Sequence, residues 1–548
     1  MRALRPTLAL LLLPAIGPAA LADSAAVVHD PAYVLPSDAE LEREGARIGR
    51  ITIESDDIFD ETDPREDAVL YRAVNRLHVT THESTIRAQL LFASGDPYSR
   101  RVLEESERAL RRQRYLREPV IQPVAWHDGV VDVRVRSEDV WTTNPGISVS
   151  RAGGENKFGA EIEELNLFGR GKQLSAGYTH DVDRTSLGVA WRDPAVWGSR
   201  WTSNASYTDS DDGNGWTLGL ERPFYALDTR WSAGFSAGSV SEIENRYALG
   251  TRVDAWRADR QALELHRGWS SGLQDGWVRR WTAGFRYDRA RFEPADTALA
   301  GPLPGDRTLA YPYARLELLQ DDFATAHNLD QIGRTEDLRF GTQLGAELGW
   351  SQSAFGASRD ALVASLVASR GYRLPGNQAL FVAGSWNTRL EGGRLRDSLL
   401  SASARYFWRA NDKTVLFVGL AADQGSALDL DHELTLGGDS GLRGYPLRYQ
   451  TGTARALLTV EGRYFTDWYP LRLARVGAAV FADIGRSWGP SALDVAELGT
   501  LRDVGIGLRL GNTRSALGNV LHIDLAFPLD GDPSLKSMQF LLKTHKSF

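Results

Sequence analysis

The stretch LTLGGDSGLRGYPL, residues 434–447, holds four glycines and a single cation, Arg443. Glycine permits backbone angles and close approaches that other residues do not. An isolated Arg-Gly-Tyr is most often part of a solvated surface loop, because polar loops of this kind are common. The alternative is a long loop that folds back into the protein and is held there by its charge. The sequence that follows favours this alternative.

Four segments after the loop alternate between apolar and polar residues, and they are 456–465, 479–485, 504–510 and 521–527. Period-two alternation predicts strands with one buried face. A soluble sandwich points its polar residues outward into water. A membrane barrel instead points its apolar residues into lipid and keeps charged residues in its lumen. The strands alone leave both folds open.

The N-terminus has the pattern of an export signal. Residues 1–5 are basic, residues 8–16 are apolar, and Ala20-Leu21-Ala22 offers a small-residue cleavage site, so residues 1–22 are expected to be a signal peptide. No other run approaches the ~18 apolar residues that a spanning helix needs, and the mean hydropathy of -0.31 agrees. An exported chain of this kind is expected to be either soluble or a barrel.

The composition favours the barrel. The 16 Trp, 17 Tyr and 19 Phe residues often stand near predicted strand ends, and aromatic residues gather at both interfaces of membrane barrels. The chain has no Cys, which excludes disulfides, thiolate metal sites and a Cys nucleophile. The net charge of -8 argues against nucleic acid as a partner. The terminal Phe548 closes an amphipathic run and resembles the C-terminal signal of bacterial outer-membrane barrels.

The mature chain divides into three parts. Residues 23–45 are rich in Pro, Ala and acidic residues and are expected to be a linker. Residues 46–138 predict a small α+β unit in the order strand, helix, helix, strand, strand, with a hairpin at His127-Asp128-Gly129. This order, with the sequence FASGDPYS at 92–99, resembles the POTRA domain that precedes certain outer-membrane barrels. A barrel is expected over 142–548, with the glycine-rich loop at 434–450 folded inward.

Three motifs in order resemble the BamA/TamA superfamily of outer-membrane assembly and translocation barrels, the surface-antigen type. They are the loop motif at Leu442, Arg443, Gly444 and Tyr445, the strand motif of Phe481, Asp483 and Gly485, and the later run of Gly505, Gly507 and Arg509. The resemblance spans about 46–548. It implies a mainly β, transmembrane antiparallel barrel preceded by one POTRA domain. Sixteen strands are expected because family members generally have sixteen, although the alternating runs count to about twenty.

The resemblance and the strand parity together predict a lock between the loop and the barrel. Asp483 alternates with apolar neighbours that are expected to face lipid, so its carboxylate is expected to face the lumen and to need a cation. We expect Arg443 to supply that cation, with Glu461 and Arg509 completing the network. Gly444, Tyr445, Phe481 and Gly485 are expected to shape the same site.

The resemblance implies that the chain inserts or translocates polypeptides at the bacterial outer membrane, with its N-terminal domain in the periplasm and without a cofactor. An edge strand of that domain is expected to bind unfolded clients by strand addition, and Pro123 fits such an edge. A seam between about 146–154 and 538–548 is expected to be weak, because Gly153 and Gly154 cannot pack a side chain there.

Other functions stay open. A two-partner secretion transporter would pass one dedicated exoprotein, and a channel or lipid-transport barrel is a further alternative. An enzyme is not expected: His180, Asp181, Asp183 and Ser186 cluster in sequence, but catalytic triads are recognised by geometry and not by proximity along the chain. No metal or nucleotide motif is present, and the expected partners are the outer-membrane bilayer and polypeptide clients.

Overall fold

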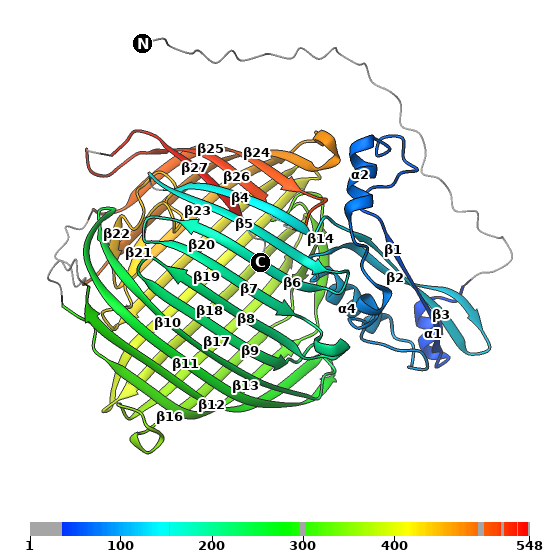
Figure 1. Ribbon diagram of the computed structural model, residues 1–548, viewed down its shortest axis with the longest axis horizontal. Coiled ribbons are helices and arrows are strands. Elements are labelled where there is room, and N and C mark those ends of the chain that lie inside the picture. Colours follow the sequence, from blue (N-terminus) through cyan, green and yellow to red (C-terminus); the bar gives the residue numbers. More distant parts are fainter. Residues whose placement is uncertain are drawn as a thin grey trace, which may run out of the picture.

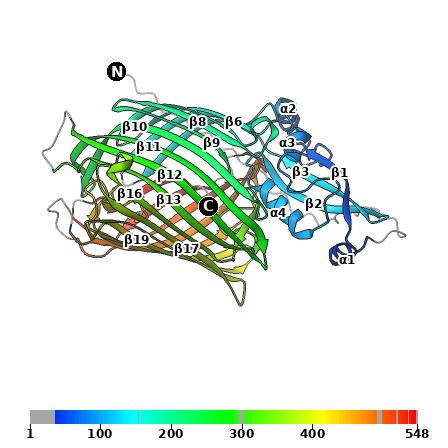
Figure 2. The ribbon, with the colours of Figure 1, turned by 90° about the horizontal axis from the view of Figure 1, so that it is seen from below.

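The computed structural model describes residues 35–152, 154–295, 302–490, 498–516, 520–533 and 535–545. The signal peptide expected at 1–22, most of the expected linker and Phe548 lie outside these residues. A large barrel forms most of the described chain, and a smaller α+β domain lies against one of its ends (Figures 1 and 2).

The expected antiparallel barrel is confirmed, and within the described residues it closes with twenty strands. In chain order these strands are β4 (Thr143–Ala152), β5 (Glu155–Leu167), β6 (Lys172–His180), β7 (Thr185–Asp193), β8 (Thr202–Ser210), β9 (Gly213–Arg222), β10 (Trp231–Ala248), β11 (Thr251–Gln274), β12 (Trp277–Pro294), β13 (Arg307–Gln320), β16 (Gln343–Ser351), β17 (Ala361–Leu374), β18 (Gln378–Glu391), β19 (Arg394–Asn411), β20 (Thr414–Ser426), β23 (Ala454–Phe465), β24 (Ala474–Trp488), β25 (Leu501–Asn512), β26 (Val520–Pro528) and β27 (Gln539–His545).

The preference for sixteen strands is therefore wrong, and the count of about twenty alternating runs is right. Sixteen would require some runs to be the arms of hairpins outside the barrel wall. Instead each of the twenty runs pairs with a neighbour on both sides, and β27 meets β4 to close the barrel. Alternation in sequence identifies a strand but not its partners.

Burial along β24 shows which residues face the lumen and which face the outside of the barrel. Val480 is 61% exposed and Ile484 is 40% exposed, whereas Asp483 between them is fully buried. Alternate residues of a strand point to opposite faces of the sheet, so the apolar residues cover the outside and the carboxylate points into the lumen. The described part of the chain contains no helix that is both long and apolar enough to cross a membrane.

The α+β domain has a three-stranded sheet in the order β1-β3-β2, in which β1 is parallel and β2 antiparallel to β3. Its elements are α1 (Asp38–Arg43), β1 (Arg47–Asp56), α2 (Val69–Leu77), α3 (Glu83–Arg87), α4 (Arg100–Arg111), β2 (Leu116–His127) and β3 (Val130–Asp139). Leu103 and Leu110 of α4 are fully buried against the sheet. Arg101, Arg108 and Arg111 of α4 face the barrel side, where they pair with Asp228, Asp321 and Asp337.

The linker expected over 23–45 is interrupted by α1. Ser37 and Glu40 form a capping box, with the Ser37 N–H donating to Glu40 at 2.8 Å, and Leu41 is fully buried in the domain core. A six-residue helix with one buried side chain leaves no periodic apolar pattern in the sequence. That is why composition alone indicated a linker.

Two small hairpins leave the barrel wall. The hairpin of β14 (Phe323–His327) and β15 (Thr335–Arg339) lies between β13 and β16, at the end that carries the α+β domain (Figure 1). The hairpin of β21 (Leu434–Leu436) and β22 (Gln450–Gly452) lies between β20 and β23, at the far end. Short 3-10 turns η1 (Val196–Gly198), η2 (Ser353–Phe355) and η3 (Pro470–Arg472) complete the described elements.

Candidate functional site

The glycine-rich loop between β21 and β22 carries Arg443 into the barrel, where it meets Asp483. The Arg443 Nε donates to Asp483 Oδ2 at 2.7 Å and its Nη2 donates to Asp483 Oδ1 at 3.0 Å. Thr459 on β23 donates a third hydrogen bond to the same carboxylate at 2.8 Å. Bidentate pairing of a guanidinium with a carboxylate fixes orientation as well as charge. The structure thus brings together Arg443 and Asp483, which were expected to pair because alternation along the strand places Asp483 in the lumen.

Two further carboxylates surround Arg443. Its Nη1 donates to Glu461 at 2.8 Å and lies 3.4 Å from Asp524. Arg509 bonds the same two carboxylates, with its Nη2 at 3.1 Å from Glu461. The Arg443 guanidinium also lies over the Phe481 ring, 3.3 Å from its centroid. The charges alternate in space, so neither arginine is left without an anion.

The two residues after Arg443 fix the loop backbone. The Gly444 N–H donates to Asp503 at 3.0 Å. The Tyr445 hydroxyl donates to the carbonyl of Arg502 at 2.7 Å and also lies 3.1 Å from the carbonyl of Asp530. Tyr445 itself is fully buried. The loop is therefore held by its main chain as well as by its cation.

Glycine is needed where the loop and the wall approach closely. A Cβ at Gly485 would lie 2.9 Å from Leu436 and 3.1 Å from the carbonyl of Ala456. A Cβ at Gly505 would lie 2.3 Å from the ring of Phe481, the ring on which Arg443 stacks. A side chain at either position would displace the loop or the aromatic platform.

Asp503 and Asp524 belong to this site and were missing from the residues expected there. Both signals were available in the sequence: Asp503 shares its parity with Arg509 on β25, and Asp524 alternates with apolar residues on β26. Parity places a residue in the lumen but does not say how far along the strand axis it lies. Register between strands decides that distance, and the sequence does not give it.

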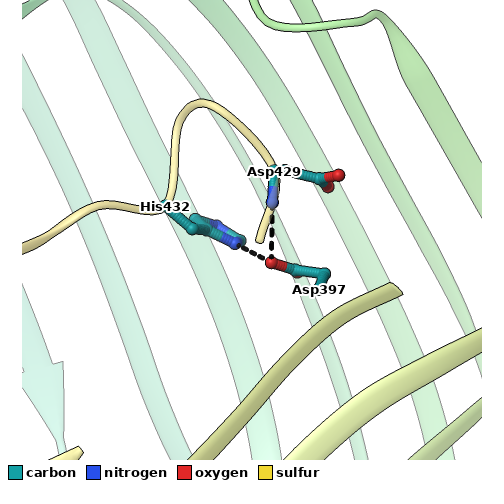
Figure 3. Close-up of side chains that lie close together, drawn as sticks. All are labelled: Asp397, Asp429 and His432. Carbon is teal, nitrogen blue, oxygen red and sulfur yellow. Dashed lines mark hydrogen bonds and ion pairs between the residues drawn. The ribbon is translucent and has the colours of Figure 1, made fainter. Parts of the chain in front are cut away.

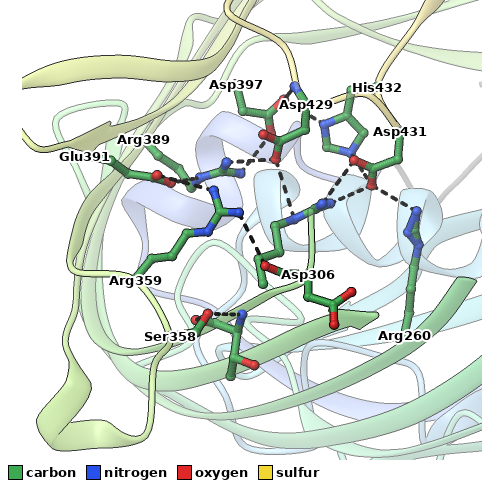
Figure 4. Close-up of polar contacts among 12 residues, drawn as sticks. Arg260, Asp306, Ser358, Arg359, Arg389, Glu391, Asp397, Asp429, Asp431 and His432 are labelled. Atoms are coloured by element: carbon green, nitrogen blue, oxygen red, sulfur yellow. Dashed lines mark hydrogen bonds and ion pairs between the residues drawn. The ribbon is translucent and has the colours of Figure 1, made fainter. Parts of the chain in front are cut away.

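A second charged network holds the segment that leads into the loop (Figure 4). Asp431 pairs with Arg260 on β11 at 3.0 Å and with Arg307 on β13 at 2.6 Å. Asp429 pairs with Arg389 on β18 at 2.8 Å. These strands lie away from β24, so the loop is fastened to separate parts of the barrel wall.

Asp397, Asp429 and His432 each place one possible metal ligand atom within 4.8 Å of the others (Figure 3). Arg389 bonds both carboxylates, at 3.0 Å from Asp397 and 2.8 Å from Asp429. A cation already occupies the position where a metal would compensate charge, so we assign an ionic network. His432 lies in the connection between β20 and β21, outside the barrel strands, and its hydrogen bond with Asp397 raises the pKa of its imidazole.

The hairpin of β14 and β15, residues 323–339, forms a plug at the end of the lumen near the α+β domain. We call it the mouth hairpin. Its Leu329 and Ile332 are buried in a cluster with Phe407, Val415 and Phe465 of the barrel. Sequence reasoning missed it, because two five-residue runs do not differ in pattern from short barrel strands.

The mouth hairpin is tied to the α+β domain. Arg111 on α4 donates two hydrogen bonds to Asp337, at 2.9 and 2.7 Å. Glu118 accepts hydrogen bonds from the N–H and the hydroxyl of Thr335. The Arg108 guanidinium lies over the ring of Phe323, 4.4 Å from its centroid. These contacts make α4 and the hairpin neighbours across 200 residues of chain or more.

Ion pairs also link the mouth hairpin to the loop. Arg463 on β23 donates to Glu461 at 3.0 Å and lies 3.4 Å from Asp330 at the hairpin tip. Glu461 is the residue that accepts from Arg443. Charged contacts therefore run from the inward loop to Asp330 of the hairpin, and a separate pair, Asp337 with Arg111, joins the hairpin to α4.

Solved structures similar to this chain include two CdiB proteins and a BamA. CdiB from Acinetobacter baumannii is 13% identical, with a TM-score of 0.48 and coverage of 91% of this chain and 74% of that chain. CdiB from Escherichia coli is 14% identical, with a TM-score of 0.47 and coverage of 91% and 76%. BamA from Haemophilus ducreyi lacking POTRA domains 1–3 is 13% identical, with a TM-score of 0.38 and coverage of 90% and 84%.

At 13–14% identity the likeness concerns the fold and carries no information about role. No protein-family model and no curated protein matches the sequence.

The barrel closes at β27 and β4 through one register pair within the described residues, Leu542 opposite Arg151. Its neighbours pair at length: β26 and β27 pair from Val520 to Ala526. Lys543 on β27 points inward, and its Nζ donates to the carbonyl of Gly438 in the loop at 2.6 Å. The seam and the inward loop are therefore in direct contact.

The cluster considered for catalysis has other partners. The Ser186 hydroxyl bonds the Ser210 hydroxyl at 2.8 Å, and the His180 ring bonds Thr185 at 2.8 Å. Asp183 accepts from Arg448 of the loop at 2.6 Å. These contacts hold a turn and fasten the loop, and they do not place Ser186 against His180.

Proposed function

We propose that this chain inserts or translocates polypeptides at the bacterial outer membrane, with its α+β domain, a POTRA domain by its order of elements, in the periplasm. The observation that carries the proposal is the short seam between β27 and β4. A barrel abolishes sheet edges only while all its strands are paired. Within the described residues this seam has one register pair, Leu542 with Arg151, so we take it as the place where the sheet separates most easily and where another strand could enter.

A client strand that pairs with β27 would continue the sheet and leave its own far edge for the next strand. Separating the seam breaks few backbone hydrogen bonds compared with the long ladders elsewhere, such as β10 with β11 from Trp231 to Ala248. Lys543 of β27 donates to Gly438 in the inward loop. The last strand of the barrel is therefore joined directly to the loop that Arg443 holds in place. Opening at β27 would thus disturb the loop.

The edge strand β2 of the periplasmic domain is closed to clients. Pro119 and Pro123 lack the N–H that a paired strand donates. Between them the Ile121 N–H donates to Glu107 at 2.7 Å, and the Ile121 carbonyl accepts from Arg100 at 3.1 Å. The two prolines therefore lack the N–H groups that a client strand would need. The two α4 side chains already bond the N–H and the carbonyl of Ile121, with which a client would otherwise pair.

The other edge strand, β1, is the better candidate for client capture. Its first half is covered: the Ile48 N–H donates to Asp96 at 2.9 Å and the Ile48 carbonyl accepts from Gly95 at 2.7 Å. The second half, 52–56, has β3 as its sole strand neighbour in the described part of the chain. We propose that a client adds to β1 at 52–56.

A second candidate function is dedicated transport of one exoprotein, or of lipid, through the lumen. The observation that favours it is a cavity of about 1300 Å³ that reaches from Arg108 on α4 to Arg443 in the loop. Removal of the mouth hairpin and the loop would extend this cavity along the barrel. Both candidate functions would require the contacts of Arg443 with the barrel wall to open, so these contacts do not favour one function over the other.

Depletion of the protein followed by profiling of the outer-membrane proteome tests the proposal. Broad loss of barrel proteins is the result expected for an insertase, and loss of a single exoprotein is the result expected for a dedicated transporter. An unchanged proteome would contradict both and would leave the channel or lipid role.

A further inference from the structure

A second cavity, of about 390 Å³, lies at the mouth of the barrel between α4 and the barrel wall. Arginines from five different segments line it: Arg108 of α4 with Arg112 directly after the same helix, Arg192 of β7, Arg200 of the β7–β8 connection, Arg280 of β12 and Arg339 of β15. We call this space the arginine cavity. It is separate from the lock around Arg443, and nothing in the proposed function requires it.

Several of these arginines have neutral partners. Arg280 donates from Nη2 to the carbonyl of Ala226 at 3.2 Å and lies over the Phe224 ring, 4.8 Å from its centroid. The Arg280 Nε is buried and has no hydrogen-bond partner among the described residues. Arg200 donates to the carbonyl of Leu90 and stacks on a tyrosine ring. Carbonyls and rings orient a guanidinium but do not neutralise it.

The carboxylates near the cavity are few and are engaged elsewhere. Glu105 accepts from the Leu227 N–H at 2.7 Å and pairs with Arg101 at 3.0 Å. Arg108 has Asp321 at 3.9 Å. Glu317 is a further carboxylate whose field reaches Arg280. Asp337 also acts on Arg112, although it accepts two hydrogen bonds from Arg111. Six arginines therefore face these four carboxylates, and the cavity has an excess of positive charge.

Burial adds to the cost of holding this charge. It lowers the pKa of Arg112 and of Arg200, both of which lie outside the barrel strands. A pKa lowered by burial means that the charged form lacks compensating anions. An anion bound in the cavity would supply the negative charge that these buried arginines lack.

We propose that the arginine cavity binds a compact phosphate-bearing anion, either the headgroup of a phospholipid or a soluble phosphate ester. The planar guanidinium matches phosphate oxygens in a two-point geometry, and arginines converge here from both domains. The volume of about 390 Å³ is that of a small-ligand pocket. Phe224, Tyr225 and Phe323 supply apolar walls for a glycerol or sugar portion.

Isothermal titration calorimetry on the full chain in a non-ionic detergent tests the proposal. The probes are glycerol 3-phosphate and dihexanoyl phosphatidylglycerol, with hexaglutamate as the peptide probe. Saturable binding of a phosphate probe is expected. Arg280→Gln and Arg112→Gln should each weaken it about tenfold, since a charge-assisted hydrogen bond is worth more than 1.4 kcal/mol. Arg279→Gln is the matched control, because Arg279 is the exposed neighbour on the opposite face of β12.

The outcomes decide both the site and the source of its ligand. Tighter binding of the lipid assigns a headgroup, and tighter binding of glycerol 3-phosphate assigns a soluble ester. Failure of both phosphate probes, equal binding by Arg280→Gln and Arg279→Gln, or binding of hexaglutamate alone would overturn the proposal. Arg112→Gln lies in the other domain, so it keeps the test valid if Arg280→Gln does not fold. The client assays of the proposed function are independent of these results.

Discussion

Arg443 donates two hydrogen bonds to Asp483, at 2.7 and 3.0 Å, across the lumen of the barrel. Asp483 is fully buried, and the Arg443 side chain is 13% exposed. Two charges held this far from bulk water depend on each other. Without Arg443, Asp483 keeps the Thr459 hydroxyl as a partner but loses its cation. Without Asp483, Arg443 keeps Glu461 and Asp524 but loses its two-bonded partner. The inward position of the loop around Arg443 therefore depends in part on this pair.

We predict that Arg443→Ala and Asp483→Asn each destabilise the inward loop by up to ~3–5 kcal/mol, less to the extent that water enters the lumen. The double variant should be little worse than either single variant. Limited proteolysis of the loop measures the change, and a double-mutant cycle measures the coupling. Arg502→Ala is the control, because Arg502 makes a similar two-bonded pair with Asp530 at the surface. Its expected effect is much smaller, because solvent screens an ion pair at the surface. Additive losses at Arg443 and Asp483 would contradict the pairing.

A disulfide across the seam should stop function. Leu542→Cys with Arg151→Cys places the two cysteines directly opposite each other on β27 and β4, and the chain has no other Cys. Oxidation is expected to abolish client assembly and reduction to restore it. Ile523→Cys with Leu542→Cys is the control, because it shares one cysteine but locks β26 to β27. Full activity of the oxidised seam variant would rule out lateral opening.

The edges of the periplasmic sheet should differ in client contact. Thr52 on β1 and Gln122 on β2 both lie opposite Arg134 of β3 and both are exposed. A photo-crosslinking residue at Thr52 is expected to capture nascent outer-membrane proteins, whereas one at Gln122 is expected to capture few or none. Equal yields at the two positions would show that the prolines and Glu107 do not close β2.

The mouth hairpin should loosen when its tie to α4 is removed. Arg111→Ala breaks the two-bonded pair with Asp337 and is expected to raise the single-channel conductance in planar bilayers and the protease sensitivity of 323–339. Arg101→Ala is the matched control, since Arg101 lies on the same helix and pairs with Asp228 of a barrel turn. A conductance unchanged by Arg111→Ala, or changed equally by both, would mean that α4 does not hold the plug.

The mouth hairpin should also respond to pH through Glu336. Burial raises the pKa of its carboxyl to about 7 from an ordinary value of 4.5. A raised pKa means that the folded hairpin favours the protonated form. The stabilising contribution is full below pH 4.5 and is lost as the pH rises through about 7. Conductance is therefore expected to rise between pH 6 and 8, roughly one unit on either side of that pKa, and Glu336→Gln should remove the rise. A rise that persists in Glu336→Gln would assign it to another group.

The sequence by itself determined the kind of barrel and which residues face its lumen. Period-two alternation is a local property, so the lumenal face of Asp483 and Arg509 could be read from neighbouring residues. The loop was identifiable because its glycines and its single cation stand together at 434–447. About twenty alternating runs were also countable, and the choice of sixteen came from the resemblance to a family and not from the residues.

Only the tertiary structure decided which of these residues meet. The positions of Asp503 and Asp524 beside Arg443 depend on the stagger between strands, and stagger is set by packing around the closed barrel. The mouth hairpin and the arginine cavity join α4 to segments 200 residues away, such as Asp337. Contacts of that kind leave no periodic trace in sequence, because they depend on where the closed sheet places its ends and not on any local pattern.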